Sequence, residues 1–162
     1  IPCAPVNTVN EALVDVQTEA RGGLVEHEGV MTLASPLRFT RVSSGFSRNR
    51  KHPVLGYTKA HLGVDYAAPT GTPVRAMASG RVTYAGWKGP NGKLVRIDHG
   101  NGLQSAYAHL HRISRGIKRG AKVKQKQIIG QVGTTGRSTG PHLHFEIREN
   151  GTPVNPGQYL RL

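Results

Sequence analysis

The stretch TGPHLHFEI, residues 139–147, places two histidines on either side of a single leucine. Polar and apolar residues alternate along it, which is the period of a β-strand with one buried face. The polar side chains then share one face, namely His142, His144 and Glu146. The apolar side chains share the other face, namely Leu143, Phe145 and Ile147. We therefore predict a strand whose apolar face joins the core and whose polar face carries chemistry.

Other histidines stand at spacings that bear on that chemistry. A second His-x-His occurs in YAHLHR, residues 107–112, and His61 precedes Asp65 by four residues in HLGVDY. In an extended segment this even separation keeps both side chains on one side. Two histidines and a carboxylate are a typical donor set for Zn²⁺, which has three protein ligands in catalytic sites and four in structural ones. Spacing alone leaves open whether one or both of His142 and His144 bind the metal.

Turn signals rich in Gly and Pro separate short apolar or alternating runs from about residue 33 onward. The predicted strands are 38–43, 73–76, 80–86, 94–99, 103–109, 127–132 and 142–148. HGNGL at 99–103 predicts a hairpin, and GPNGK at 89–93 predicts a second turn. This pattern predicts a mainly β fold.

Charge divides the chain near residue 28. Residues 1–28 hold five acids and one base, a net charge of −4, whereas the other 134 residues hold 21 bases and four acids, a net charge of +17. Helical spacing over residues 8–21 predicts a short helix in the acidic part. We predict an acidic helical or linker segment, 1–34, and a β domain, 35–162. The acidic segment either docks on the basic domain and restrains it, or serves as a passive linker.

The net charge of +13 predicts association with a polyanion, which is a nucleic acid, an anionic membrane or an anionic cell wall. Aromatic residues make up only 6% and are dispersed, which argues against a specific nucleic-acid module. The basic stretch RGIKRGAKVKQKQ at 115–127 predicts an exposed turn and strand edge. No apolar run approaches the about 20 residues that span a bilayer. Cys3 is the single cysteine, so an internal disulfide and a cysteine metal site are excluded.

Three motifs follow one another in a fixed order: HLGVD at 61–65, YAHL at 107–110 and GPHLHF at 140–145. Together with GRVTYAG, IDHGNGLQSAYAHL and VNP, they resemble the M23 family, the lysostaphin and LytM type of zinc endopeptidases that cut peptidoglycan peptides. The resemblance covers residues 41–156. It implies an antiparallel β-sheet domain that binds one Zn²⁺.

The resemblance also implies a role for the residues of these motifs. His61, Asp65 and His144 would be the zinc ligands, and His109 and His142 would be the catalytic histidines beside the metal. The ligand count agrees, because a tetrahedral catalytic site has three protein ligands and keeps one position for water. One catalytic histidine would accept a proton from the attacking water. The other would help to stabilise the oxyanion and to protonate the leaving amine.

Further residues receive lesser roles. The predicted substrate contacts are Tyr57, Thr139 and Gly140. Glu146 either orients a zinc ligand from behind or is an exposed strand residue. His111 is expected at the rim of the site, and His99 is expected in a turn.

We expect a monomeric enzyme, periplasmic or secreted, that hydrolyses peptide cross-links of peptidoglycan and is attracted by its charge to the anionic wall surface. The stretch RNRKHPVLGYTKAHLGVDYAAPTGTPV resembles the Gram-negative branch of the family, which cuts the D-Ala to meso-diaminopimelate bond. The alternatives are a glycyl-glycine endopeptidase, as in the lysostaphin branch, and a non-cutting member that binds the wall or activates an amidase. A complete set of ligands and catalytic histidines favours cutting over binding alone.

Overall fold

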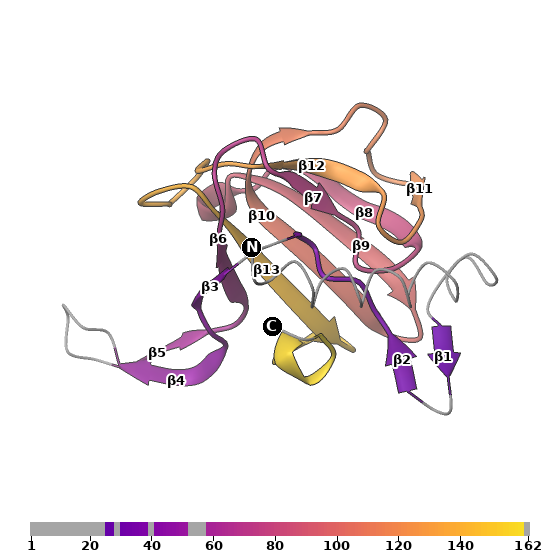
Figure 1. The fold of residues 1–162 in the computed structure, drawn as a ribbon, viewed down its shortest axis with the longest axis horizontal. Coiled ribbons are helices and arrows are strands. Elements are labelled where there is room, and N and C mark those ends of the chain that lie inside the picture. Colours follow the sequence, from indigo (N-terminus) through magenta and orange to yellow (C-terminus); the bar gives the residue numbers. More distant parts are fainter. Residues whose placement is uncertain (1–24, 28–29, 39–40, 52–57, 161–162) are drawn as a thin grey trace.

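The protein is described by a computed structural model, which covers residues 25–27, 30–38, 41–51 and 58–160 (Figure 1). The predicted helix at 8–21 lies outside the described residues, as does most of the acidic segment. No helix among the described residues is long and apolar enough to cross a membrane.

The described residues form strands joined by short turns. In chain order the strands are β1 (Val25–His27), β2 (Val30–Thr32), β3 (Arg41–Ser44), β4 (Ser47–Lys51), β5 (Thr58–His61), β6 (Val64–Ala67), β7 (Pro73–Arg75), β8 (Gly80–Trp87), β9 (Lys93–Gly100), β10 (Leu103–Ile113), β11 (Lys122–Val123), β12 (Ile128–Val132), β13 (His142–Glu149) and β14 (Thr152–Val154). The 3₁₀ helices are η1 (Gly89–Asn91) and η2 (Pro156–Gln158).

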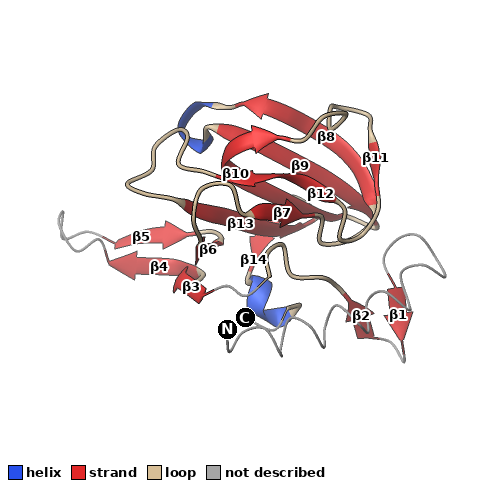
Figure 2. Cartoon of the chain, turned by 45° about the horizontal axis from the view of Figure 1, so that its top comes forward, coloured by secondary structure: helices blue, strands red, loops and turns tan. Residues whose placement is uncertain are grey.

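One large antiparallel sheet dominates the molecule (Figures 1 and 2). Its strands follow the order β11-β8-β9-β10-β13-β6-β3, with β14 paired to β13. A further strand, β12, pairs with both β10 and β7. Two small hairpins, β1–β2 and β4–β5, are separate from this sheet. The predicted mainly β, antiparallel fold is confirmed.

Each predicted strand overlaps an observed one, and both predicted turns are present. Asn101 stands at φ +53° between β9 and β10, which is the left-handed conformation that an Asn-Gly hairpin requires. The prediction missed several short strands, among them β5, β6 and β14. Strands of two to four residues show too few alternations for a period of two to be recognised. The basic stretch 115–127 does form an exposed turn and an edge strand, β11, as predicted.

The core lies on one side of the large sheet. Leu143, Phe145 and Ile147 of β13 are all 0% exposed, as the alternation predicted. Tyr66 and Tyr107 pack their rings against Phe145, with ring centroids 6.3 and 5.3 Å apart. Burial of each such side chain stabilises the fold by about 1.5–3 kcal/mol. The apolar half of the 139–147 stretch therefore anchors the strand that carries the two histidines.

The opposite side of β6, β8, β9, β10 and β13 is called here the outer face. Cross-strand register defines it, because directly paired residues point to the same side of a sheet. The paired residues on this face are Asp65 with His144, Ala106 with both Glu146 and Arg96, and Ala108 with His144. A small apolar cluster of Leu94, Ala106, Ala108 and Tyr84 covers part of it. The outer face therefore carries the polar half of β13.

His99 is a buried strand residue and not the predicted turn residue. It lies in β9 and is 9% exposed, and it continues the core-facing period of Val95 and Ile97. Its Nδ1 is 2.9 Å from the Ser79 carbonyl oxygen, and its Nε2 is 2.7 Å from Ser105 Oγ. Burial lowers the pKa of His99, while the Ser79 carbonyl opposes that shift. The hairpin begins just after this residue, so the turn signal was read too early.

Boundary residues 33 and 34 touch the domain core. Leu33 is 5% exposed and Ala34 is 0% exposed, and the Ala34 N–H donates to the Met77 carbonyl at 2.9 Å. Both residues were placed at the end of the acidic segment. The division of the chain at residue 34 stays a prediction.

Candidate metal centre and catalytic histidines

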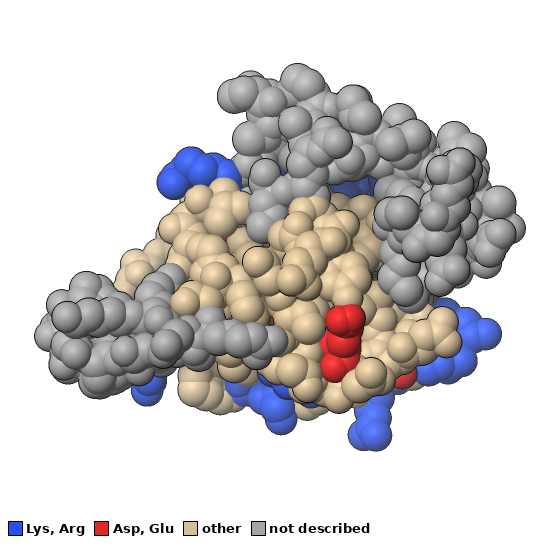
Figure 3. All heavy atoms as spheres, turned by 90° about the horizontal axis from the view of Figure 1, so that it is seen from below, with Lys and Arg blue, Asp and Glu red and all other residues tan. Residues whose placement is uncertain are grey.

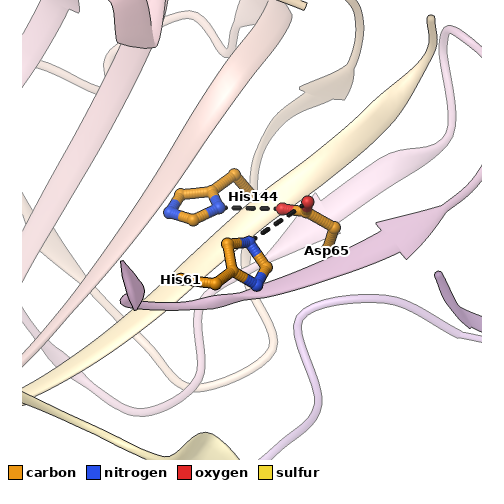
Figure 4. Close-up of side chains that lie close together, drawn as sticks. All are labelled: His61, Asp65 and His144. Carbon is orange, nitrogen blue, oxygen red and sulfur yellow. Dashed lines mark hydrogen bonds and ion pairs between the residues drawn. The ribbon is translucent and has the colours of Figure 1, made fainter. Parts of the chain in front are cut away.

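Three predicted ligands converge at one end of the outer face (Figure 4). His61, Asp65 and His144 each offer one ligand atom, and these atoms lie within 4.8 Å of one another. Asp65 Oδ1 is 2.8 Å from His144 Nδ1, and Asp65 Oδ2 is 3.2 Å from His61 Nε2. Asp65 and His144 meet because they are directly paired between β6 and β13. Regular strand pairing thus brings together two of the three residues of the cluster.

The third predicted ligand, His61, is brought to the cluster by a bend in the chain. His61 ends β5 and Asp65 lies in β6, with Leu62 and Gly63 between the strands. The stretch from His61 to Asp65 is therefore divided by a bend and is not one continuous strand. A Cβ atom at Gly63 would lie 2.6 Å from the Phe145 carbonyl oxygen and 2.8 Å from His144 Cε1. Only glycine lets this bend pack against β13, so the bend brings His61 to the other two ligands.

Each ligand histidine is held through its second ring nitrogen. The Nδ1 of His61 lies 2.6 Å from the Gly45 carbonyl oxygen. A carbonyl only accepts, so this contact places a proton on Nδ1, and Nε2 is the ring nitrogen that faces Asp65. In His144 the arrangement is reversed, because Nε2 donates to Glu146 Oε2 at 2.9 Å and Nδ1 faces Asp65. Such contacts fix the tautomer and ring orientation of metal-binding histidines.

Glu146 in turn accepts hydrogen bonds from the guanidinium of Arg148. Arg148 donates to Glu146 Oε1 from both Nε, at 3.0 Å, and Nη2, at 2.8 Å. The two bonds fix the carboxylate and leave Oε2 for His144. Of the two roles expected for Glu146, the contacts favour orientation of His144.

The interactions in the cluster favour an ionised Asp65 carboxylate next to a protonated His144 imidazole. Burial opposes ionisation of Asp65, but hydrogen bonds and charge from His144 and His61 hold its pKa well below the ordinary range. Burial opposes protonation of His144, but hydrogen bonds to Asp65 and Glu146 outweigh it and raise its pKa to about 9. Burial likewise opposes ionisation of Glu146, while His144 and Arg148 lower its pKa. In the metal-free protein His144 therefore holds protons on both nitrogens at neutral pH.

The other two predicted histidines form a pair beside the cluster. The ring centroids of His109 and His142 are 4.8 Å apart, and that of His109 is 6.2 Å from that of His144. His109 Nδ1 donates to the Thr135 carbonyl at 2.7 Å, and His142 Nδ1 donates to the Gly140 carbonyl at 2.8 Å. Both contacts place a proton on Nδ1. His142 Nε2 stands 3.9 Å from Asp65 Oδ1.

His109 reaches this position through an irregularity in β10. Tyr107 faces the core and Ala108 the outer face, so a regular strand would turn His109 toward the core. Instead His109 has φ +62°, and the register of β10 on β9 shifts between Tyr107 and Leu110. This bulge directs His109 to the outer face and returns Leu110, 0% exposed, to the core.

Thr135 fastens the bulge from the loop between β12 and β13. Its carbonyl accepts from His109, and its hydroxyl donates to the Leu110 carbonyl at 2.7 Å. The same hydroxyl accepts from the Lys93 N–H at 3.1 Å. Gly92, at φ +62°, admits the loop, because a Cβ there would lie 2.4 Å from Thr135. Sequence reasoning gave Thr135 no role, although the sequence TTG at 134–136 is a turn signal.

Burial also sets the charge state of His109. It is 8% exposed, and burial lowers its pKa. The Thr135 carbonyl opposes the shift, and the nearby His142 and His144 reinforce it. A neutral His109 with a lone pair on Nε2 is able to accept a proton near pH 7.

The other residues that the sequence analysis assigned to the site are not part of the metal cluster. Gly140 contacts the site through its carbonyl, which orients His142. Thr139 is exposed in the same loop, and Tyr57 lies outside the described residues. His111 is exposed in β10, and its carbonyl accepts from Lys93 Nζ at 3.0 Å. The roles of Tyr57, Thr139 and Gly140 in substrate binding stay predictions.

Two imidazoles and a carboxylate that suit a divalent metal, with two further imidazoles beside them, define the site of a metallohydrolase. The sequence pattern of the family described as Peptidase family M23 matches residues 59–156, which is more than half of the chain. The chain belongs to peptidase family M23.

Individual relatives agree with this assignment. The chain is 49% identical over 135 residues to the DD-carboxypeptidase/endopeptidase Mpg of Neisseria meningitidis serogroup B, which covers 83% of this chain and 30% of that protein. It is 51% identical over 124 residues to the peptidoglycan DD-endopeptidase ShyC of Vibrio cholerae, covering 76% of this chain and 28% of that protein. A zinc-containing peptidase from Vibrio cholerae superimposes with a TM-score of 0.71 at 34% identity, covering 83% of this chain and 43% of that chain. The chain thus spans less than a third of the two curated relatives.

Proposed function

We propose that this domain is a zinc-dependent endopeptidase that hydrolyses peptide cross-links of bacterial peptidoglycan at the D-Ala to meso-diaminopimelate bond. The observation that carries the proposal is the convergence of His61, Asp65 and His144, with His109 and His142 beside them. The names of Mpg and ShyC support DD-bond cleavage in peptidoglycan.

The donor set fits zinc. Two imidazole nitrogens and one carboxylate are a three-ligand set of the catalytic type, which leaves a coordination position free. In both ligand histidines the nitrogen that faces away from the cluster donates to an acceptor, which prepares the other for a metal. When bound, zinc would supply a Lewis acid that activates water and polarises the scissile carbonyl.

The two remaining histidines handle protons in this proposal. Their Nε2 atoms carry lone pairs on the side of the metal cluster, and their Nδ1 protons are fixed by backbone carbonyls. One ring accepts the proton of the attacking water. The other ring, when it is protonated, donates a hydrogen bond to the oxyanion and helps to protonate the leaving amine. Rings held at one orientation need little rearrangement between these steps.

Charge supports a polyanionic partner. Lys and Arg stand out along the margins of the described surface in Figure 3, while Asp and Glu occupy small areas. A basic domain is attracted to the carboxylates and phosphates of a cell wall, and this raises its local concentration there. We accordingly propose that the domain acts outside the cytoplasm, as a monomer, on the wall surface.

The test is mass spectrometry of the products released from purified sacculi of two wall chemistries, with and without a chelator. Chelator-sensitive products with new D-Ala and diaminopimelate termini are expected. New glycine termini from a glycine-bridged wall would overturn the bond assignment. Binding to both walls without new termini would overturn cleavage and leave a wall-binding domain.

A further inference from the structure

Arg96 is a cation on the outer face that no carboxylate of the described residues neutralises. Its partner in β10 is Ala106, and Ala106 pairs on its other side with Glu146 of β13. Directly paired residues point to the same side of a sheet, so Arg96 shares the outer face with Glu146. Two strand spacings, about 10 Å, separate the two strands.

The guanidinium lacks its usual partners. Arg96 is half-buried, and its Nε is buried without a hydrogen-bond partner among the described residues. A guanidinium has five N–H donors, and of these only the Nε donor of Arg96 is buried without a partner in the described part of the chain. The four donors on its two Nη nitrogens are not among these unpaired buried atoms, and a carboxylate of a ligand can accept from them.

The nearby acids of the outer face are occupied elsewhere. Glu146 accepts from Arg148 and from His144 through its two oxygens. Asp98, two residues along β9, accepts from the Gly100 N–H at 2.9 Å. Within the described ranges neither acid forms an ion pair with Arg96. Arg96 therefore has no ion-pair partner between these two acids and remains available to a carboxylate of a ligand.

The strand between Arg96 and the metal cluster is β10, and its side chains at this point of the outer face are small. Its outer-face residues are Ala106 and Ala108, whose methyl groups do not separate Arg96 from the histidines. A peptide lying across them in an extended conformation would cover about 10 Å with about three residues. A group about three residues from the cleaved bond could therefore reach Arg96 while that bond lies at the metal cluster.

We propose that Arg96 binds a carboxylate of the substrate peptide and selects peptides that carry one about three residues from the cleaved bond. Arginine suits this task because its planar fork forms two parallel hydrogen bonds to a carboxylate. The carboxylate comes either from the end of the peptide chain or from an acidic side chain. This inference rests on the proposed peptidase activity and adds a specificity-determining residue to it.

The test uses the zinc-loaded protein and three versions of one cross-linked stem-peptide dimer. One version has free carboxylates, one has its chain-end carboxyls amidated, and one has its side-chain carboxyls amidated. Arg96→Gln is expected to raise KM for the free peptide by about 10- to 100-fold, the range for a hydrogen-bonded charged pair. For the version that lacks the recognised carboxylate, wild type and Arg96→Gln should be equal, which identifies its source.

A matched control separates recognition from general charge. Arg119→Gln removes the same charge from the exposed turn before β11 and should change KM for all three peptides equally and slightly. Arg96→Gln should bind zinc and melt like wild type or higher, because it removes an uncompensated charge. Arg96→Lys, which keeps charge without the fork, should recover only part of the KM.

The outcomes distinguish this inference from the proposed function. If no peptide is cut, calorimetric binding of the same three peptides replaces KM, and the same pattern of losses is expected. Equal loss by Arg96→Gln for free and amidated peptides would overturn the carboxylate contact. A lower melting temperature with unchanged KM would make Arg96 a structural residue and overturn it as well.

Discussion

Two parts of the site reach the outer face by different means. Between β6 and β13, regular pairing puts Asp65 opposite His144, and the side chains meet as the alternation requires. In β10 the alternation breaks, and His109 reaches the outer face only because its backbone adopts φ +62°. Regular strand pairing gives two of the three predicted metal ligands, and an irregular strand gives a catalytic candidate.

The difference predicts different responses to substitution. The ligand pair depends on strands whose core faces are fully buried, so changes there should act on metal binding and leave the fold intact. The bulge depends on a few hydrogen bonds from one loop, so changes there should act on turnover. Separate measurement of metal affinity and turnover therefore tests the comparison.

The largest effect is expected for the neighbours His144 and His142. His144→Ala should abolish stoichiometric zinc binding, because it removes one of three ligands. His142→Ala should keep zinc and lower kcat by about 10²–10⁴-fold, the usual contribution of a general acid or base. Metal content by atomic emission and peptide turnover measure the two effects. Equal zinc loss in both variants would reverse the assignment of the His-Leu-His pair.

Metal affinity should rise with pH by about 50-fold from pH 7 to pH 9. In the metal-free protein the pKa of His144 is raised to about 9, so its Nδ1 carries a proton at pH 7. A metal must displace that proton, which gives a tenfold gain in affinity per pH unit until the pKa is reached. Calorimetry at pH 7 in buffers of different ionisation enthalpy should count about one proton released. A pH-independent affinity over this range would contradict the bonding of His144 to both carboxylates.

Glu146→Gln should weaken zinc binding by about 10- to 100-fold, the usual cost of removing the partner of a ligand histidine. The amide keeps the shape but loses the negative charge that holds the Nε2 proton of His144. Competition with a zinc indicator measures the affinity. Glu149→Gln, on the same strand and bonded to Tyr159, is the control and should bind zinc like wild type. Equal affinities for the two variants would show that Glu146 does not prepare His144 for the metal.

The regular part of the site could be predicted from sequence, and the irregular part could not. Alternation in 139–147 correctly separated the core face of β13 from its histidine face. The same reasoning assumed one extended segment from His61 to Asp65 and missed the bend at Gly63, since sequence does not show what a Cβ would meet. It would also have directed His109 to the core, and only the family resemblance gave it a role. Carbonyl partners such as those of Gly45 and Thr135 leave no trace in side-chain pattern.

The smallest and most specific effect is expected for Thr135→Val. Valine keeps the volume and the carbonyl that orients His109, but loses the hydroxyl that ties the loop to Leu110 and Lys93. Two lost hydrogen bonds should cost about 2 kcal/mol of stability, at about 1 kcal/mol each. Because the His109 ring then loses its fixed orientation, kcat should fall about tenfold, by analogy with other residues that orient a functional side chain. KM and zinc affinity should not change.

Two further variants serve as controls for the fall in kcat expected of Thr135→Val. Thr135→Ser restores the hydroxyl and should recover kcat. Thr72→Val removes a comparable hydroxyl bond, to the Pro69 carbonyl, and should reduce stability without altering kcat. If Thr135→Val and Thr72→Val have the same kcat, the loop does not hold His109, and the bulge is stable by itself. If Thr135→Val also loses zinc, the ligand pair and the bulge form one unit, and the separation between regular and irregular parts of the site fails.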